Sequence, residues 1–200
     1  MVQRIIGLTG GIATGKSTVS DYLAQHHGLP ILDADLYARE AVAPGTDILE
    51  AISQRYGPTL LAADGSLNRS QLGQIIFTDP AEKQWLEQQI HPFVRQRFAD
   101  QMATLSEANI VVQAIPLLFE ANLTGQVSEI WVVTCPEAIQ KARLIARDRL
   151  SEADAISRIQ SQWPLSDKVA WADRVLHNDR TLGALYEQCD RALRSGPTSP

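Results

Sequence analysis

The chain has 200 residues, of which 44% are hydrophobic and 20% are charged, and its formal net charge is −5 at pH 7. This balance excludes the broad basic surface of a general nucleic-acid binder. Two cysteines without CxxC spacing exclude a zinc ribbon or a disulfide framework, and no apolar run approaches the roughly 18 residues of a membrane span. We therefore expect a cytoplasmic, monomeric globular protein without nucleic-acid or membrane partners.

The first predicted elements alternate between strand and helix. RIIGLT (4–9) is a short β-branched apolar run that predicts a buried strand, and KSTVSDYLAQHH (16–27) predicts a helix that Gly28 ends. LPILDAD (29–35) predicts a second strand that stops at an acidic pair. Strand, helix and strand in this order form a βαβ unit, which indicates an α/β fold with a parallel sheet covered by helices.

Residues 36–105 carry a helical and more polar pattern. TDILEAISQRY (46–56) has apolar residues at helical spacing, and Asp79-Pro80 followed by Glu82 is a typical helix start. Proline disrupts helix interiors, so the helix that begins there is predicted to break near His91-Pro92. We predict that this segment is a helical acceptor-binding insertion between the strands of the core.

The second half of the chain returns to alternating strands and helices. Strands are predicted over 109–115, 129–134 and 173–178, and helices over 136–149, from Ser151, and over 181–195. The last residues, GPTSP (196–200), are predicted to be disordered. Residues 1–35 and 106–200 would then form the nucleotide-binding core of a single domain over 1–200.

The stretch GLTGGIATGKSTV (7–19) lies between the first predicted strand and the first predicted helix. Gly10, Gly15, Lys16 and Ser17 match the phosphate-loop pattern G-x-x-x-x-G-K-[ST]. Small residues let backbone N–H groups turn inward around phosphate oxygens, and the positive end of the helix dipole faces the same anion. Because the motif sits between a strand and a helix, a chance glycine-rich turn is the weaker interpretation.

The polar residues of this loop have expected roles. Lys16 can reach the β- and γ-phosphates, Ser17 can ligate Mg²⁺, and Thr18 can support the α-phosphate. The dinucleotide fingerprint G-x-G-x-x-G is absent, which favours ATP or GTP over NAD. The absence of Asn-Lys-x-Asp weakens a GTPase switch. No acidic residue ends the strand 109–115, which argues against a motor ATPase and leaves Mg²⁺ to Ser17, the phosphates, water and Asp33.

Asp33 and Asp35 end the second predicted strand, at the edge where parallel sheets bind ligands. Residues two apart on a strand point to the same side, so a carboxylate there could take a proton from an attacking hydroxyl or help to hold Mg²⁺. Asp35 could equally cap a helix that begins at Leu36. We favour the chemical role for Asp33 and leave both interpretations of Asp35 open.

The segment KARLIARDR (141–149) carries four positive residues and one negative residue. Arg143 and Arg147 are four apart and share a helix face, and Arg158 follows. Phosphoryl transfer spreads negative charge over the moving group, and arginines on a closing lid could stabilise that charge. A solvated charged face is the alternative. We predict a lid over 138–165 and prefer Arg147 to the other two arginines as its acting residue.

Three further polar residues each have two interpretations. Arg69 could bind a phosphate of the acceptor or stabilise a turn, and His91 could donate a hydrogen bond to the substrate or simply end a helix. Asn178 follows the last predicted strand, where it could recognise a nucleotide base or form a turn.

Several motifs together resemble those of the dephospho-CoA kinase family: IGLTGGIATGKSTV, ILDAD, DGSLNR, IHP, IPLLFE, RLIARDRLSEADAISRIQSQ and ADRVLHN. Their order and spacing fit the family over nearly all of the chain. The resemblance implies a P-loop kinase fold with a five-stranded parallel sheet, a helical CoA-binding domain and a lid. It also implies the last step of coenzyme A synthesis, in which ATP, with Mg²⁺, phosphorylates the 3′-hydroxyl of the ribose of dephospho-CoA to give CoA and ADP.

By this resemblance Asp33 is the general base, Arg147 is the lid residue, and Asn178 lies near the adenine. Arg69 and His91 would face the acceptor. The loop residues implied to bind ATP are Gly11, Ile12, Ala13, Thr14, Gly15, Lys16, Ser17 and Thr18. The chain departs from the family at Ala13-Thr14, where Gly-Ser is common. Alanine keeps the loop conformation provided that its φ is negative.

Two other functions are compatible with the sequence alone. Another small-molecule kinase, for a nucleoside or nucleotide acceptor, would share the loop, Asp33 and the lid arginines and would differ in the acceptor pocket within 36–105. A non-catalytic nucleotide-binding regulator would bind ATP without acceptor-dependent turnover. Asp33 and the basic lid argue against the regulator.

Overall fold

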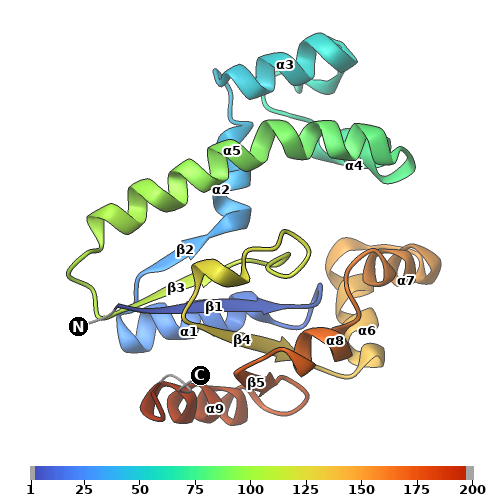
Figure 1. The fold of residues 1–200 in the computed structure, drawn as a ribbon. Coiled ribbons are helices and arrows are strands. Elements are labelled where there is room, and N and C mark those ends of the chain that lie inside the picture. Colours follow the sequence, from blue (N-terminus) through green and yellow to red (C-terminus); the bar gives the residue numbers. More distant parts are fainter. Residues whose placement is uncertain (1–2, 197–200) are drawn as a thin grey trace. The chain divides into compact units, whose positions relative to one another are not determined.

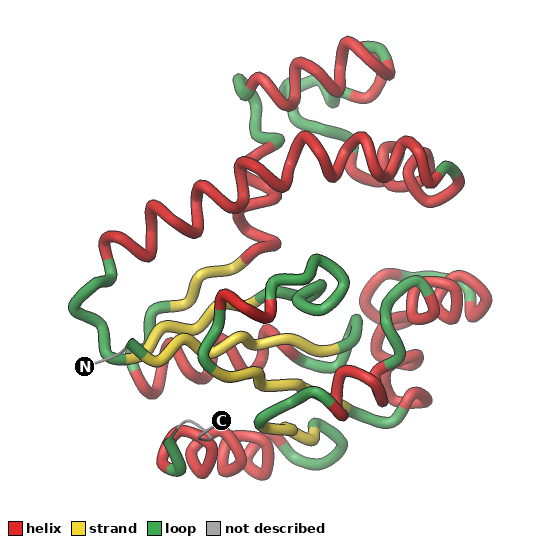
Figure 2. The backbone as a smooth tube through the Cα atoms, in the orientation of Figure 1, coloured by secondary structure: helices red, strands yellow, loops and turns green. Residues whose placement is uncertain are grey.

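A computed structural model describes residues 3–196 of the chain. They form two compact units, one of residues 3–33 and 105–196 and the other of Ala34–Thr104. Figure 1 labels the elements of both units, and Figure 2 shows the strands of the first unit in yellow and the helices in red. Except for Gly196, the tail predicted to be disordered lies outside the described residues.

The first unit contains a five-stranded sheet in the order β2-β3-β1-β4-β5, in which every pairing is parallel. Its strands are β1 (Arg4–Gly10), β2 (Ile31–Asp33), β3 (Ile110–Ala114), β4 (Glu129–Thr134) and β5 (Arg174–His177). The fold class predicted from the sequence is therefore confirmed. Because all strands run the same way, the loops that leave their carboxyl ends gather at one edge of the sheet.

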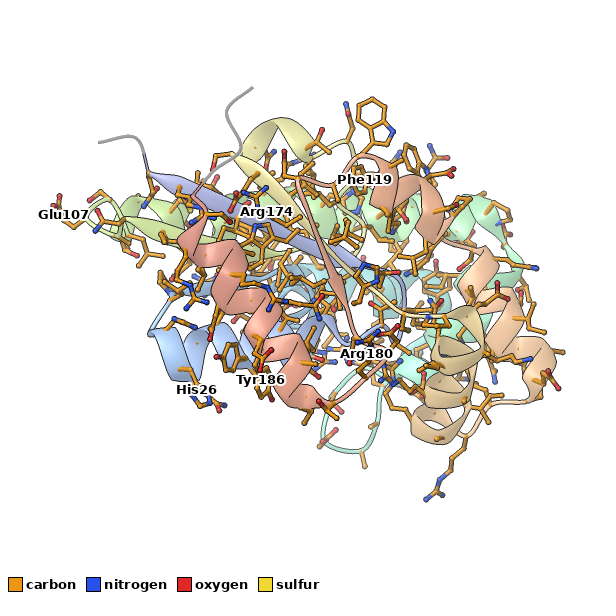
Figure 3. The ribbon with its side chains drawn as sticks, turned by 90° about the horizontal axis from the view of Figure 1, so that it is seen from below. His26, Glu107, Phe119, Arg174, Arg180 and Tyr186 are labelled. Carbon is orange, nitrogen blue, oxygen red and sulfur yellow. The ribbon has the colours of Figure 1, made fainter. Side chains whose placement is uncertain are left out.

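Helices α1 (Lys16–His27) and α9 (Leu182–Arg194) pack against the sheet and against each other (Figure 1). The rings of Tyr22 in α1 and Tyr186 in α9 stack with their centroids 4.0 Å apart, and Figure 3 shows His26 beside Tyr186 on this contact. Apolar side chains of both helices and of the strands fill one core, which includes Ile6, Leu8, Val19, Leu23, Val112, Trp131, Leu176 and Leu185. Burial of this apolar area anchors the strand and helix that flank the phosphate loop.

Three helices follow β4 in the chain: α6 (Glu137–Asp148), α7 (Glu152–Gln160) and α8 (Leu165–Ala170). The Ser151 hydroxyl accepts a hydrogen bond from the Asp154 amide at 3.1 Å, so Ser151 caps α7 as predicted. No element was predicted where α8 lies. Its Lys168 is fully buried and pairs with Glu120 at 2.7 Å, which ties α8 to the loop after β3. A short 3₁₀ turn, Thr124–Gln126, follows in the same loop.

The second unit is helical. It comprises α2 (Ala34–Ala41), α3 (Asp47–Tyr56), a 3₁₀ turn (Pro58–Leu60), α4 (Arg69–Thr78) and α5 (Pro80–Thr104). A separate core of apolar side chains holds it together: Val42, Leu49, Ile52, Leu60, Leu67, Leu72 and Leu86. As the sequence predicted, Asp79 caps α5, and its carboxylate accepts from the Ala81 amide at 2.8 Å.

Two predictions about elements are wrong. The second strand ends at Asp33 rather than residue 35, because helix α2 begins at Ala34 and takes Asp35 into its first turn. The break expected at His91-Pro92 does not occur, and α5 runs through Pro92 for 25 residues. Proline removes one N–H, but Pro92 lies on the exposed face of α5, and packing of this helix against α2 and α4 offsets that single loss.

Within residues 3–196, no helix combines the length and the apolar character that crossing a bilayer requires.

Candidate active site

The phosphate loop joins β1 to α1 at the carboxyl edge of the sheet. Within the loop, the Thr14 amide and hydroxyl both donate to the Gly11 carbonyl, at 3.2 and 2.8 Å. Asn178, just after β5, donates from Nδ2 to the Thr14 carbonyl at 2.8 Å and is buried. Gly15 has φ 101°, and a Cβ there would lie 2.1 Å from Nδ2 of Asn178. Glycine is therefore required at this position by both conformation and space.

Ala13 has φ 60°, so the condition of a negative φ that the sequence analysis attached to this residue is wrong. A left-handed conformation costs an L-residue about 1–2 kcal/mol relative to its ordinary conformations. The loop therefore keeps its turn with alanine where glycine is common, but only because neighbouring contacts hold the strained backbone in place.

Two side-chain amides bind Ile12, the residue before Ala13. Gln140 on α6 donates from Nε2 to the Ile12 carbonyl at 2.7 Å. The Ile12 amide donates to Oε1 of Gln162, which follows α7, at 2.8 Å. Neither glutamine was singled out from the sequence. Their positions lie 128 and 150 residues from Ile12. Gln162 ends the motif RLIARDRLSEADAISRIQSQ and Gln140 lies outside every quoted motif, and neither position reveals a contact with the loop.

Lys16, Ser17 and Thr18 form the first turn of α1, and no acidic residue stands in this turn of the described helix. Its positive end therefore has no carboxylate from its own first turn, which suits an anionic ligand. Ser17 is exposed, so its hydroxyl is accessible to a ligand.

Asp33 ends β2, with its Cα opposite Ala114 of β3, and it is half-buried. β3 separates it from β1, so Asp33 lies two strand spacings, or roughly 10 Å, across the edge from the strand that feeds the phosphate loop. Asp35 does not share this position, because it belongs to the first turn of α2 in the helical unit. The expectation that both carboxylates point the same way from one strand is wrong.

The three arginines of the predicted lid have different surroundings. Arg147 contacts the carboxylate of Asp148 through Nε and Nη2, at 2.7 and 3.0 Å, and Arg158 approaches the same carboxylate at 3.3 Å. The hydrogen bonds from Arg147 lower the pKa of Asp148. Arg143 instead lies beside Cys135, and among the described residues its buried Nη1 atom finds no hydrogen-bond partner. Burial raises the pKa of the Cys135 thiol, and Arg143 opposes that shift.

Arg69 and His91 both lie in the helical unit. Arg69 begins α4 and donates to the Arg39 carbonyl in the last turn of α2 at 3.4 Å, and burial lowers the pKa of its guanidinium. His91 is exposed in the middle of α5 rather than at a helix end. Contact of either residue with the acceptor stays a prediction.

The donor set of the site suits a magnesium ion carried by a nucleotide. Within the described residues there is no group of three or more His, Cys, Asp or Glu side chains that could hold a metal ion. Mg²⁺ in nucleotide sites takes few protein oxygens and keeps phosphate and water ligands, and the exposed Ser17 hydroxyl at the helix N-terminus is an oxygen donor of the kind it takes.

A five-stranded parallel sheet, a loop of the G-x-x-x-x-G-K-S type after its central strand and a helix whose positive end faces the loop define a P-loop kinase. The family model for dephospho-CoA kinase matches residues 4–183. This match spans both units, so the chain belongs to the dephospho-CoA kinase family.

Individual relatives agree with this assignment. The chain is 57% identical over 190 residues to a dephospho-CoA kinase of Synechocystis sp., with 95% of this chain and 94% of the relative covered. A crystal structure from Thermus thermophilus is 33% identical, covers 100% of both chains and gives a TM-score of 0.83. The dephospho-CoA kinase from Campylobacter jejuni is 28% identical, with 97% of each chain covered and a TM-score of 0.69.

Proposed function

We propose that the protein transfers the γ-phosphoryl group of ATP to the 3′-hydroxyl of the ribose of dephospho-CoA, giving CoA and ADP. The observation that carries this proposal is the dephospho-CoA kinase match over residues 4–183, which includes the phosphate loop, Asp33, the helical unit and the predicted lid. This reaction is the last step of coenzyme A synthesis.

The phosphate loop supplies most of the electrostatic stabilisation in this proposal. Phosphoryl transfer places growing negative charge on the equatorial oxygens of the moving group and on the leaving oxygen. The backbone amides at the start of α1, the dipole of this helix and the Lys16 ammonium are the positive groups to which we assign the stabilisation of this charge. Mg²⁺, when bound with the nucleotide through Ser17, would supply further neutralisation of the phosphates.

Asp33 acts in this proposal as the base for the acceptor. As the ribose oxygen forms its bond to the γ-phosphorus and the bond from phosphorus to the β-bridging oxygen breaks, the hydroxyl proton passes to the Asp33 carboxylate. The position of Asp33 at the end of β2 supports this role, because the carboxyl edge of a parallel sheet is where ligands bind.

Arg147 is the residue that we assign to the lid. Asp148 fixes its guanidinium by two hydrogen bonds and also holds Arg158, so one carboxylate sets the orientation of two arginines at the junction of α6 and α7. A guanidinium binds phosphate oxygens through paired N–H donors in a fixed plane, which is the chemistry that the proposal assigns to Arg147.

The test is ADP release with ATP and Mg²⁺ in the presence of dephospho-CoA, of a panel of nucleosides and nucleotides, or of no acceptor. We expect turnover that depends on dephospho-CoA, with CoA as the product. Turnover with a different acceptor would contradict the proposed substrate and favour another small-molecule kinase. ATP binding without any acceptor-dependent turnover would favour the non-catalytic regulator.

A further inference from the structure

The peptide groups on both sides of Ile12 are held by glutamines from a distant part of the chain. The Ile12 amide belongs to the peptide shared with Gly11, and Gln162 accepts its hydrogen bond at 2.8 Å. The Ile12 carbonyl belongs to the peptide shared with Ala13, and Gln140 donates to it at 2.7 Å. Together the two bonds fix the planes of two successive peptides, and so they fix the backbone between Gly11 and Ala13.

The strained backbone of Ala13 explains why these two hydrogen bonds matter for the loop conformation. Its φ of 60° depends on the orientation of the peptide that precedes it, which is the peptide that Gln140 holds. A left-handed alanine costs about 1–2 kcal/mol, and a typical net hydrogen bond contributes about 0.5–1.5 kcal/mol. Two such bonds are therefore of the size needed to keep the loop in a conformation that an L-residue does not favour.

The lack of space beside Gly11 shows that the loop is shaped to accommodate Gln140. A Cβ on Gly11 would lie 2.7 Å from Nε2 of Gln140, so a side chain there would displace the glutamine. Gln140 is itself buried, with an exposed fraction of 3%. The close approach of Gln140 to the loop therefore requires glycine at position 11.

We propose that Gln140 and Gln162 are positioning residues that hold the phosphate loop in its nucleotide-binding conformation. Gln162 thereby couples nucleotide binding to the segment that follows α7, within the predicted lid. This inference rests on the proposed nucleotide role of the phosphate loop but does not require dephospho-CoA as the acceptor. The two glutamines act through Ile12 and Ala13 and are not assigned a contact with the reacting atoms.

The first variants are Gln162→Met and Gln140→Met, which keep the length of an unbranched side chain and remove its amide. We expect each to weaken ADP binding about three- to tenfold, the factor that corresponds to one net hydrogen bond. The KM for ATP should rise by the same factor and the KM for dephospho-CoA should stay unchanged. Gln160→Met is the matched control, because Gln160 is exposed two residues before Gln162.

A readout independent of activity is hydrogen exchange of the Ile12 amide in the nucleotide-free protein. We expect Gln162→Met to accelerate this exchange and Gln160→Met to leave it at the wild-type rate. Because both glutamines hold the same residue, the double variant Gln140→Met/Gln162→Met should lose less affinity than the sum of the single losses. A single cooperative thermal transition, with a midpoint lowered by no more than about 6 °C, shows that each variant is folded and has lost only the contribution of one hydrogen bond.

Three results would overturn the inference. Wild-type ADP affinity in Gln162→Met would show that this glutamine does not support nucleotide binding. Hydrogen exchange of the Ile12 amide at the wild-type rate would show that Gln162 does not bind this amide. Tighter ADP binding in this variant would show that Gln162 competes with the nucleotide instead of supporting the loop. A wild-type protein that binds ADP but does not phosphorylate dephospho-CoA would contradict the proposed function alone.

Discussion

The two ends of β1 are held by different means, although the buried Lys168–Glu120 pair shows that an ion pair also occurs in the loop that follows β3. At the amino edge, Arg4 of β1 and Glu129 of β4 form a buried ion pair at 2.7 Å, and Glu129 also accepts from the Trp131 indole at 2.8 Å. At the carboxyl edge, neutral amides from Asn178, Gln140 and Gln162 hold the phosphate loop.

The use of an ion pair at one edge and of neutral amides at the other is consistent with separate roles for the two edges. A buried ion pair stabilises the fold only while both charges remain matched, so loss of either Arg4 or Glu129 leaves the other charge buried without its partner. Neutral amides shape a loop without adding charge. The charged groups Lys16 and Asp33 at the carboxyl edge can then act on the charge of a ligand. Substitutions at the amino edge should therefore change the free energy of unfolding, and substitutions at the carboxyl edge should change the catalytic rate.

The largest effect is expected for Lys16→Ala. Loss of the ammonium removes positive charge from the transferred phosphate, and removal of one such group typically costs 10²–10³-fold in rate. We expect kcat/KM to fall by about 10³-fold in the ADP-release assay, while the urea midpoint of unfolding stays at the wild-type value. Turnover close to that of the wild type would contradict the assignment of the phosphate loop.

At the opposite edge, Glu129→Ala should reverse this pattern. Removing one partner leaves Arg4 largely buried without its carboxylate, and such a loss typically costs about 3–5 kcal/mol of unfolding free energy. Urea unfolding measures the loss. The folded fraction should retain the wild-type KM for ATP, and a raised KM would show that the two edges are not independent.

A matched control for Glu129→Ala is Glu187→Ala. Glu187 pairs with Arg191 at 3.9 Å on α9, with side chains 75% and 64% exposed. An exposed pair of this kind contributes little, so we expect a change in unfolding free energy within about 0.5 kcal/mol.

Asp33→Asn tests a second charged group at the carboxyl edge beside Lys16. The substitution removes a base and keeps the shape of the side chain. General-base catalysis typically contributes 10²–10⁴-fold, and we expect kcat to fall about a hundredfold. ATP affinity, measured by titration calorimetry, should remain unchanged. If ATP affinity falls while kcat is unchanged, Asp33 serves the nucleotide or its Mg²⁺ rather than the acceptor hydroxyl.

Ala13→Gly should have a smaller effect with the opposite sign on stability. Glycine adopts the left-handed conformation without strain, but it also gains entropy in the unfolded chain. The two terms partly cancel, so we expect the unfolding free energy to rise by less than about 1 kcal/mol. Urea unfolding tests this expectation, and a loss of stability would show that the strain at Ala13 is smaller than the entropy that glycine gains in the unfolded chain.

The smallest effect is expected in the helical unit, which contributes no strand to the sheet. Arg55 and Tyr56 donate to Glu82, and these hydrogen bonds, with Arg55 first, lower the pKa of Glu82 to about 2. A depressed pKa means that the stabilisation is complete above the ordinary value of 4.5 and is lost as the pH falls from there towards 2.

Glu82→Gln should remove this pH dependence. We expect a flatter curve of thermal midpoint against pH between 4.5 and 2 than in the wild type, with the difference between the two proteins greatest above pH 4.5. Parallel curves over this interval would contradict the role of Glu82. Scanning calorimetry at several pH values measures the thermal midpoint of both proteins.

The sequence predicts the parts of this molecule that local patterns specify. The strand before the loop, the helix from Lys16 to His27 and the caps at Asp79 and Ser151 follow from apolar runs, glycine and capping chemistry over a few neighbouring residues. The five apolar runs predicted as strands match β1 to β5, whereas the acceptor came from the family resemblance alone.

The remainder depends on contacts between distant residues. Pro92 stays helical because of packing that the sequence around it does not show, and Asp35 leaves the strand because α2 begins two residues earlier than the expected Leu36. The left-handed Ala13 and the glutamines that hold Ile12 belong to one arrangement assembled from three separate segments. A motif identifies the loop, but it does not identify the side chains that support it.

The hydrogen bonds that Arg4 donates also bear on the order in which parts of the chain can fold during synthesis. Arg4 donates to the carbonyls of Ala192 and Leu193, so the first strand is joined to the last turn of α9. The neighbours of β1, which are β3 and β4, begin only at Ile110 and Glu129. A nascent chain therefore carries an incomplete sheet until His177, the end of β5, has emerged from the ribosome, and the bonds from Arg4 form only after residue 193 has followed. Every residue of the helical unit, by contrast, is available once Thr104 has emerged.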